Sequence, residues 1–162
     1  MPIQPTAETI KALQAIAEEL FDETDAGRVT IRIDTPNDRD YPVLAEARAP
    51  GVSSITGGMT LVGYKPIDIH QASTFLILKN ERKMIVQRDV RVDPPQIPAL
   101  EDLYGMTSQM LAPLEHKGEF VGVVSVHAVD PRDWTGKAIE AIEKATNRVH
   151  EVFEEANWVE LD

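Results

Sequence analysis

The histidine best placed for chemistry is His127. It ends a β-rich run that starts at Phe120, and it shares one strand face with Ser125, because residues two apart in a strand point the same way. Asp130 follows, so the residue types of a nucleophilic triad occur together. The chain has no G-x-S-x-G motif, and spacing does not show that the three side chains converge. His127 is either a residue that faces a cavity, with Ser108 on the neighbouring strand, or a structural histidine that closes the strand.

Arginine side chains offer a second kind of chemistry. Arg32 and Arg48 lie on two predicted strands, residues 28–34 and 43–49. If these strands are adjacent and antiparallel, the two guanidinium groups could approach each other and bind a carboxylate. Arg88 is a further candidate for the same role. The alternative for each arginine is an exposed ion pair with Asp or Glu.

The sequence contains no motif for other kinds of catalysis or for metal binding. The four histidines form no i, i+4 pair and no HExxH motif, and no GxGxxG loop is present. His116 and His150 are expected to be solvated, one in a hairpin turn and one in the last helix. The absence of cysteine excludes disulfides, thiolate nucleophiles, zinc–thiolate sites and thioether-linked cofactors.

Composition narrows the partners and the location. The formal net charge is −11, from 16 basic and 27 acidic residues, without a basic cluster. Nucleic acid and anionic membranes are therefore not expected partners, because both need clustered Lys and Arg. No apolar run approaches the roughly 18 residues of a membrane span, and the N-terminus lacks a signal peptide, which predicts a cytoplasmic protein. A chain of 162 residues, 43% of them hydrophobic, predicts one domain over residues 1–162.

Two amphipathic helices are predicted at the ends of the chain, over residues 6–22 and 135–157. Thr6 and Thr135 are suitable N-caps for them. Each helix carries an apolar stripe at helical spacing. The stripe of the first helix either packs within its own domain or meets a partner.

Strands and loops fill the middle of the chain. Residues 28–34 alternate apolar and polar side chains, as a half-buried strand does. The segment 50–66 is rich in Gly, Ser and Thr and predicts a loop. A short helix is expected within residues 67–79, with a strand at 75–78 as the alternative, since a short apolar run fits both. A strand at 84–87 then leads into a proline-rich loop, where a helix or central strand is forbidden.

A hairpin near the C-terminus carries a resemblance to a known family. Residues 107–114 and 120–127 are its strands, and the turn between them contains Gly118. In order, the resembling features are Ser108, Ala112-Pro113-Leu114, the short charged turn, Val121-Gly122-Val123 and Asp130-Pro131-Arg132 before an amphipathic helix. This series resembles the closing half of a GAF domain, with Trp134 where the family often has Phe. The resemblance extends over roughly residues 8–155.

The resemblance implies a fold and a place for a ligand. It implies an α+β domain with a central antiparallel sheet of five or six strands. The terminal helices would cover one face, and loops and short helices would cover a pocket on the other. In the family the proline-rich loop and the short helix after it form a pocket wall, which implies ligand contacts from Arg88, Asp89 and Tyr104.

The function that the resemblance implies is that of a stand-alone sensor domain for a small anionic or aromatic metabolite. Such a domain would dimerise through helices 6–22 and 135–157. The candidate ligand-binding residues are Arg32, Arg48, Arg88, Asp89, Tyr104, Ser108, Ser125, His127 and Trp134. Trp134 has an alternative role as an apolar plug at the entry to the last helix.

Each known activity of the family requires particular residues, and several of these are missing from this chain. Reduction of free methionine sulfoxide and covalent bilin attachment both use cysteine, which this chain lacks. The cyclic-nucleotide signature is not recognisable, because Lys79-Asn80-Glu81 lacks the Phe-Asp that should follow. No cofactor is expected, although a haem-binding member would need a histidine such as His70 or His127. Two alternatives stay open: a small enzyme with His127 as acid–base and an arginine clamp, and a structural subunit with an empty pocket.

Overall fold

The computed structural model describes residues 2–52, 54–55, 70, 72–96 and 105–160. The elements in chain order are β1 (Ile3–Gln4), α1 (Ala7–Thr24), β2 (Arg28–Ile33), β3 (Val43–Arg48), α2 (Ser73–Glu81), β4 (Ile85–Gln87), β5 (Ser108–His116), β6 (Glu119–Ala128), α4 (Gly136–Glu155) and β7 (Asn157–Trp158). Among the described residues, no helix is both long and apolar enough to cross a membrane.

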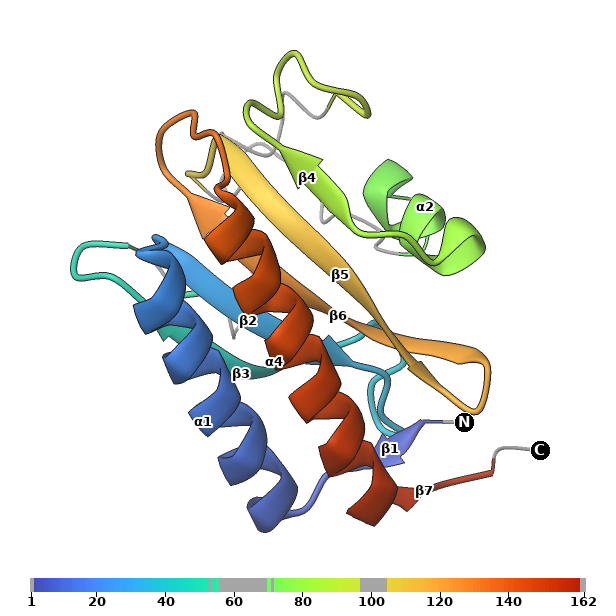
Figure 1. Cartoon of the computed structure of the whole chain (residues 1–162). Coiled ribbons are helices and arrows are strands. Elements are labelled where there is room, and N and C mark those ends of the chain that lie inside the picture. Colours follow the sequence, from blue (N-terminus) through green and yellow to red (C-terminus); the bar gives the residue numbers. More distant parts are fainter. Residues whose placement is uncertain (1, 53, 56–69, 71, 97–104, 161–162) are drawn as a thin grey trace.

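A five-stranded antiparallel sheet is the centre of the molecule. Its strand order is β3-β2-β6-β5-β4. The long helices α1 and α4 lie side by side across one face, and α2 lies beyond the other side near β4 and β5 (Figure 1). β1 and β7 form a separate pair that brings the two ends of the chain together. The expected α+β arrangement, with five or six strands and the terminal helices on one face, is confirmed.

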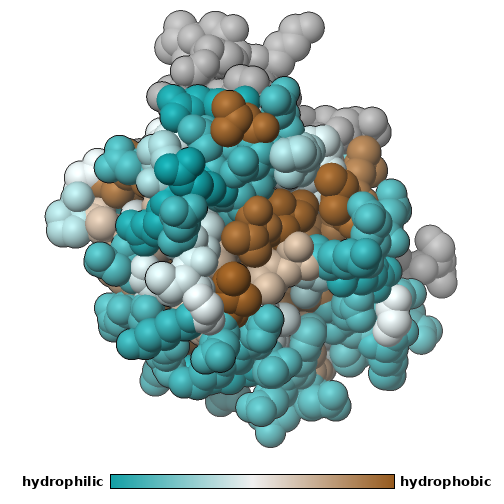
Figure 2. Space-filling view, turned by 45° about the horizontal axis from the view of Figure 1, so that its top comes forward, coloured by the Kyte–Doolittle hydropathy of each residue, from teal (hydrophilic) through white to brown (hydrophobic). Residues whose placement is uncertain are grey.

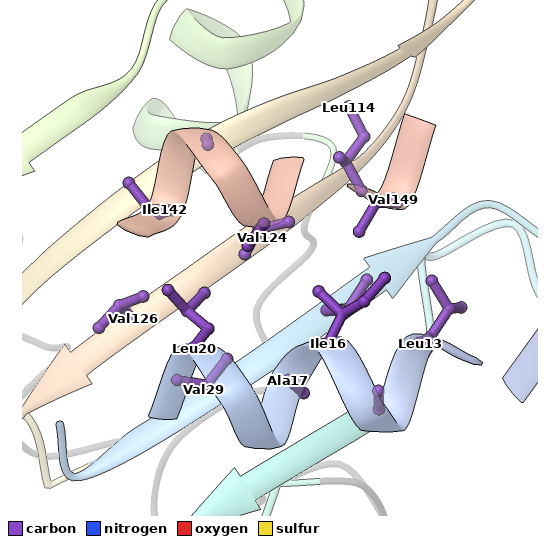
Figure 3. Packing of buried hydrophobic residues seen from close by; sticks show 14 of the residues in the cluster. Leu13, Ile16, Ala17, Leu20, Val29, Leu114, Val124, Val126, Ile142 and Val149 are labelled. Atoms are coloured by element: carbon purple, nitrogen blue, oxygen red, sulfur yellow. The ribbon is translucent and has the colours of Figure 1, made fainter. Parts of the chain in front are cut away.

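The main hydrophobic core fills the space between the sheet and the two long helices. Helix α1 contributes Leu13, Ile16 and Leu20, and α4 contributes Ile142 and Val149 (Figure 3). Alternate residues of the strands pack against them, among them Val29, Leu114, Val124 and Val126 (Figure 3). The apolar stripe predicted for the first helix therefore packs against the chain's own sheet.

The surface groove between α1 and α4 is crossed by ion pairs within the chain. Lys144 on α4 contacts Glu19 at 3.2 Å and Glu23 at 3.5 Å, and Arg148 pairs with Glu19 as well. The groove holds a shallow depression of about 160 Å³, open to solvent, which lies on the helical side of the molecule. These pairs fix the two helices relative to each other above their apolar contact.

A second apolar cluster lies on the opposite face of the sheet, under α2. Phe75 and Leu78 of α2 pack on Ile85, Leu111 and Val123 of the sheet. The helix predicted within residues 67–79 is confirmed over the alternative strand, although it begins only at Ser73. Most of the loop predicted at 50–66, and the short helix expected before Gly105, lie outside the described residues.

The β5–β6 hairpin turns over two residues with positive φ. Lys117 has φ 50° and Gly118 has φ 79°, the combination that a tight turn between twisted strands requires. Further along β6, Gly122 lies so close to β2 that an added Cβ would be 2.1 Å from the carbonyl oxygen of Arg32. Glycine is needed there because no side chain fits between the strands.

The polar corner after β6 joins three elements. The Arg132 guanidinium donates to the carbonyl oxygens of Thr24 and Asp25, at 3.1 and 3.0 Å, and so caps the C-terminal end of α1. Its backbone N–H donates to the carbonyl of Arg88 after β4. Thr135 then caps α4 by accepting from the N–H of Ala138, as the sequence predicts.

The middle of the edge strand β3 is covered by one side chain of α1. The Gln14 amide donates to the carbonyl of Glu46 at 2.7 Å and accepts from the N–H of the same residue at 3.1 Å. Glu46 lies in the middle of β3, which is an edge strand. Gln14 thus satisfies the two backbone groups that a further strand would bind.

Apolar side chains also reach the surface at one end of the sheet. Figure 2, which brings the upper end of Figure 1 forward, shows them gathered amid hydrophilic residues. Val86, Val92 and Val129 are 44%, 61% and 49% exposed; they lie in β4, in the loop after it and directly after β6. Exposed apolar side chains are normal on a protein surface, so no function is drawn from them.

Candidate functional site

A row of polar residues crosses all five strands on the face opposite α1 and α4. Strand register aligns Arg48 with Arg28, Arg28 with His127, His127 with Gln109, and Gln109 with Gln87. Their faces follow from alternation, since Val29, Val126 and Met110 point into the helix-side core. All but the outermost residue, Arg48, are buried. Buried polar side chains aligned in this way need partners within the site.

Three members of the row are linked by side-chain hydrogen bonds. The Nε2 of His127 lies 3.2 Å from the Oε1 of Gln109. The Gln109 amide donates to the Oε1 of Gln87 at 2.6 Å. The Gln87 amide in turn donates to two backbone carbonyls of the proline-rich loop, those of Asp93 at 3.0 Å and Pro95 at 2.8 Å. A continuous hydrogen-bonded relay therefore runs from β6 to the loop after β4.

Positive charge converges on His127. Burial, and after it the nearby charges of Arg28 and Arg32, lower the pKa of His127 to about 3. The imidazole is therefore neutral at pH 7. The Arg32 guanidinium also donates to the carbonyl of Tyr41 at 3.2 Å, which holds it on this face. Two guanidinium groups beside a neutral imidazole make a positive region inside a chain of net charge −11.

Two hydroxyl groups lie in the next row of the same face. Thr30 pairs with Ser125, and both are buried. Within the part of the chain that the structure describes, the Oγ1 of Thr30 has no hydrogen-bond partner. A buried hydroxyl of this kind is costly unless something binds it. The two hydroxyls extend the buried polar region from Arg28 toward Arg32.

An aromatic cluster adjoins this buried polar region. Tyr41 packs edge-on against Phe75 with ring centroids 4.7 Å apart, and Phe75 packs on Phe120 at 5.2 Å. Leu111, next to Ser125 in the register, belongs to the same cluster. This one face of the sheet therefore carries cationic and hydroxyl groups next to aromatic rings. Such a combination suits a small organic ligand.

The expected pairing of Arg32 with Arg48 is not found. The register puts Arg28 across from Arg48 and Arg32 across from Val43. The Arg48 side chain is 48% exposed, lies 3.7 Å from Glu46 and donates to the carbonyl of Val52. Antiparallel pairing was correctly expected, but the offset between the strands depends on the loop that connects them.

The ligand-binding candidates described in the proline-rich loop make contacts within or next to that loop and are not part of the hydrogen-bonded relay. Arg88 is 62% exposed and pairs with Asp133 at 3.0 Å. Asp89 binds the side chain and backbone N–H of Arg91, and these hydrogen bonds lower its pKa to about 2. Tyr104 lies outside the described residues.

Ser108 does not share a cavity with His127. Like Met110, two residues further along β5, it points toward the helix side of the sheet. Its hydroxyl donates to the carbonyl of Asp130 at 2.8 Å. Asp130 is exposed whereas Ser125 and His127 are buried, so the three residue types of a triad do not assemble.

Trp134 lies at the entry to α4. It is half-buried against the main core, its ring lies 5.1 Å from the Arg132 guanidinium, and its Nε1 donates to the backbone carbonyl of Gln87 at 3.2 Å. These contacts fit the alternative role of an apolar plug at the helix entry.

The other histidines are accounted for elsewhere. His116 stacks on Trp158 at 3.9 Å, and His150 accepts from the backbone N–H of Glu115, so both are half-buried and not fully solvated as expected. Tertiary packing of the C-terminal segment covers part of them, which local sequence does not show. His70 is 41% exposed and pairs with Asp40 at 3.0 Å. Within the described ranges, no three His, Asp or Glu side chains gather to hold a metal ion.

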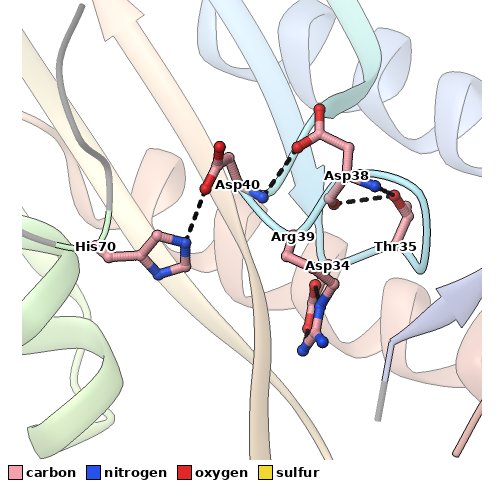
Figure 4. Close-up of polar contacts among 6 residues, drawn as sticks. All are labelled: Asp34, Thr35, Asp38, Arg39, Asp40 and His70. Atoms are coloured by element: carbon pink, nitrogen blue, oxygen red, sulfur yellow. Dashed lines mark hydrogen bonds and ion pairs between the residues drawn. The ribbon is translucent and has the colours of Figure 1, made fainter. Parts of the chain in front are cut away.

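The loop between β2 and β3 is held by its own polar contacts (Figure 4). Arg39 binds Asp34 through two hydrogen bonds of 2.6 and 2.8 Å. Thr35 closes a turn with Asp38, and the Asp38 carboxylate accepts from the N–H of Asp40. The loop carries Tyr41, with φ 54°, to the aromatic cluster beside the polar row.

Several residues of the site were missed in the sequence. Arg28 and Thr30 share the alternation of Arg32, so the same pattern could have identified them. Gln87 and Gln109 have no such signal, because only the register of β4, β5 and β6 aligns them with His127.

Comparison with solved structures finds the same fold in photoreceptor domains. The green-light-absorbing state of NpR6012g4, a red/green cyanobacteriochrome, has a TM-score of 0.73 at 12% identity, and the match covers 92% of this chain and 96% of that one. The blue-light-absorbing form of the PixJ GAF domain of Thermosynechococcus elongatus gives 0.68 at 14%, over 91% and 86%. The phycoerythrobilin-bound GAF domain of a cyanobacterial phytochrome gives 0.69 at 18%, over 91% and 86%.

Comparison by sequence identifies the family. No curated protein matches the chain. The GAF domain family matches residues 8–150, which is most of the chain. This protein therefore belongs to the GAF domain family.

Proposed function

We propose that this GAF domain binds a small organic anion on the polar face of its sheet, with Arg28 and Arg32 as the groups that attract it. The observation that carries the proposal is the convergence of both guanidinium charges on a buried, neutral His127. In a water-poor site an arginine binds a carboxylate through short, charge-assisted hydrogen bonds. The hydroxyls of Thr30 and Ser125 would orient the anion.

The ligand is expected to have an apolar or aromatic part. The rings of Tyr41, Phe75 and Phe120 adjoin the polar row and would provide the wall against which such a part packs. One structural relative is bound to phycoerythrobilin. Because this chain has no cysteine, a pigment of that kind could not form a thioether bond here and would have to bind non-covalently.

Binding is favoured over acid–base catalysis by the state of His127. A general base works best when its pKa is near the working pH. The pKa of His127 is about 3, so the imidazole is a weak base at neutral pH. Haem is also a poor fit, since the Nε2 of His127 is bonded to Gln109 and His70 is paired with Asp40 near the surface.

The proposal is tested by thermal unfolding of the purified protein with organic acids, amino acids, nucleotides, haem and a free bilin. An anionic ligand at a hundred times its dissociation constant adds about 2.7 kcal/mol to the free energy of unfolding, which raises the melting temperature measurably.

Matched variants decide where such a ligand binds. Arg28→Met and Arg32→Met each remove one positive charge from the site, and both should abolish the shift. Lys144→Met removes one positive charge from the opposite, helical side and should keep it. If no anion stabilises the protein, or if Arg28→Met and Arg32→Met respond like Lys144→Met, the proposed site is wrong.

A further inference from the structure

We infer that Gln109 and Gln87 are positioning residues for this site, which hold His127 in the tautomer that carries its proton on Nε2. The loop after β4 sets that choice through two backbone carbonyls, although neither carbonyl contacts the histidine. The role of this tautomer in ligand recognition rests on the proposed function, whereas the tautomer itself follows from hydrogen bonds within the chain.

The orientation of Gln87 is fixed first. One terminal atom of its side-chain amide lies 3.0 Å from the carbonyl oxygen of Asp93 and 2.8 Å from that of Pro95. Carbonyl oxygens only accept hydrogen bonds, so the atom facing them must be the NH₂ group, which has two hydrogens to donate. The Oε1 of Gln87 therefore faces β5. Burial enforces this orientation, since water does not reach the side chain to compensate for the reverse arrangement.

Gln109 passes the orientation on to His127. Its NH₂ group must face the Oε1 of Gln87, 2.6 Å away, because two oxygens at that distance would repel. The Oε1 of Gln109 is then the atom 3.2 Å from the Nε2 of His127, and an oxygen acceptor requires that this nitrogen bear the proton. The other tautomer would require both amides to flip, which would set the Gln87 oxygen against two carbonyls.

The tautomer gives the site a defined polarity. With its proton on Nε2, His127 offers Nδ1 only as an acceptor. A ligand group that meets this nitrogen has to be an N–H or O–H donor, while the same ligand presents its anionic group to Arg28 and Arg32. Anions that carry a hydroxyl or amino group are therefore expected to bind better than the same anions without it.

The test is a measurement of imidazole ¹⁵N shifts in the protein labelled at histidine, without ligand and at neutral pH. Long-range ¹H–¹⁵N correlations distinguish a ring protonated on Nε2 from one protonated on Nδ1. The wild-type His127 should show the Nε2–H pattern alone. Gln109→Met removes the acceptor, and Gln87→Met lets the Gln109 amide turn, so each variant should add the Nδ1–H pattern.

Two controls separate positioning from a general loss of structure. Gln109→Glu with its carboxyl group protonated donates to the Oε1 of Gln87 and again offers an oxygen acceptor to the Nε2 of His127, so it should restore the Nε2–H pattern. Met110→Leu changes the same strand on its helix side and should leave the pattern unchanged. An Nδ1–H pattern in the wild type, or an unchanged pattern in Gln87→Met, overturns the inference. These spectra need no ligand, so a failed ligand screen would refute the proposed function and leave the positioning role to be judged separately.

Discussion

His127 couples the stability of the fold to pH. Its pKa in the folded chain is about 3, against 6.5 for an ordinary histidine. As the pH falls below 6.5 the unfolded chain takes up a proton that the folded chain does not, so the free energy of unfolding decreases until the pH reaches the folded pKa. Burial lowers the pKa of His116 and His150 too, so both act in the same direction.

We expect the contribution of His127 to decrease by about 2 kcal/mol between pH 7 and pH 5. Urea unfolding of the wild type and of His127→Gln at the two pH values measures it, because the variant lacks the titrating group. The wild type should lose about 2 kcal/mol more than the variant over this interval. Equal losses would show that His127 is not protected from protonation.

At this scale the sequence predicts side-chain direction better than side-chain neighbours. Alternation correctly put Ser125 and His127 on one face of a strand. It could not find Gln109 or Gln87, and it paired Arg32 with the wrong arginine, because a register shift of one or two residues leaves the alternation within each strand unchanged.

Among the strands, Gly122 sets the distance between β2 and β6. An added Cβ would lie 2.1 Å from a backbone oxygen, so the two central strands would have to separate. We expect Gly122→Ala to lower the free energy of unfolding by about 3 kcal/mol, at the upper end of the usual cost of overpacking.

Urea unfolding of a matched pair checks this expectation. Gly136→Ala is the control, because nothing lies within 4 Å of an added Cβ there and alanine favours the helix that begins at this residue. A Gly122→Ala variant as stable as Gly136→Ala would mean that the strands are not so closely paired.

The sequence predicts the elements themselves well where a repeating pattern is long. Both terminal helices begin and end within two residues of their predicted bounds. The bounds of the two hairpin strands, β5 and β6, agree as closely. The start of α2 was missed because its short apolar run contains no helical cap, and Ala72 provides none.

At the scale of the whole molecule, dimerisation through α1 and α4 stays a prediction. Most of the apolar stripe of α1 is used inside the chain, but Ile10 is 39% exposed on that helix. If this face meets a second copy, a charge at Ile10 should separate the copies, since an unpaired charge in an apolar contact is costly.

Sedimentation of two variants checks this prediction. Ile10→Lys should be monomeric at concentrations where the wild type is dimeric. Leu76→Lys changes a similarly exposed apolar residue, at 38%, on α2 at the far side of the sheet and should stay dimeric. A monomeric wild type would contradict the predicted dimer.

Fold and ligand differ in how far the sequence predicts them. The GAF fold was predicted because the series of motifs from Ser108 to the Asp130-Pro131-Arg132 corner resembles that family, which the family match over residues 8–150 confirms. The proposed ligand site was not, because strand register decides which side chains the sheet brings together and buries.

Gln14 has a consequence for how other proteins can recognise this domain. Many partners bind a sheet by adding a strand to its edge through backbone contacts alone, which needs little sequence specificity. At the centre of β3 that contact is already made within the chain, by a side chain held on a helix. An incoming peptide would have to displace Gln14 before its first backbone hydrogen bond there. Recognition at the centre of β3 therefore requires a partner whose side chains displace Gln14, which makes it selective there.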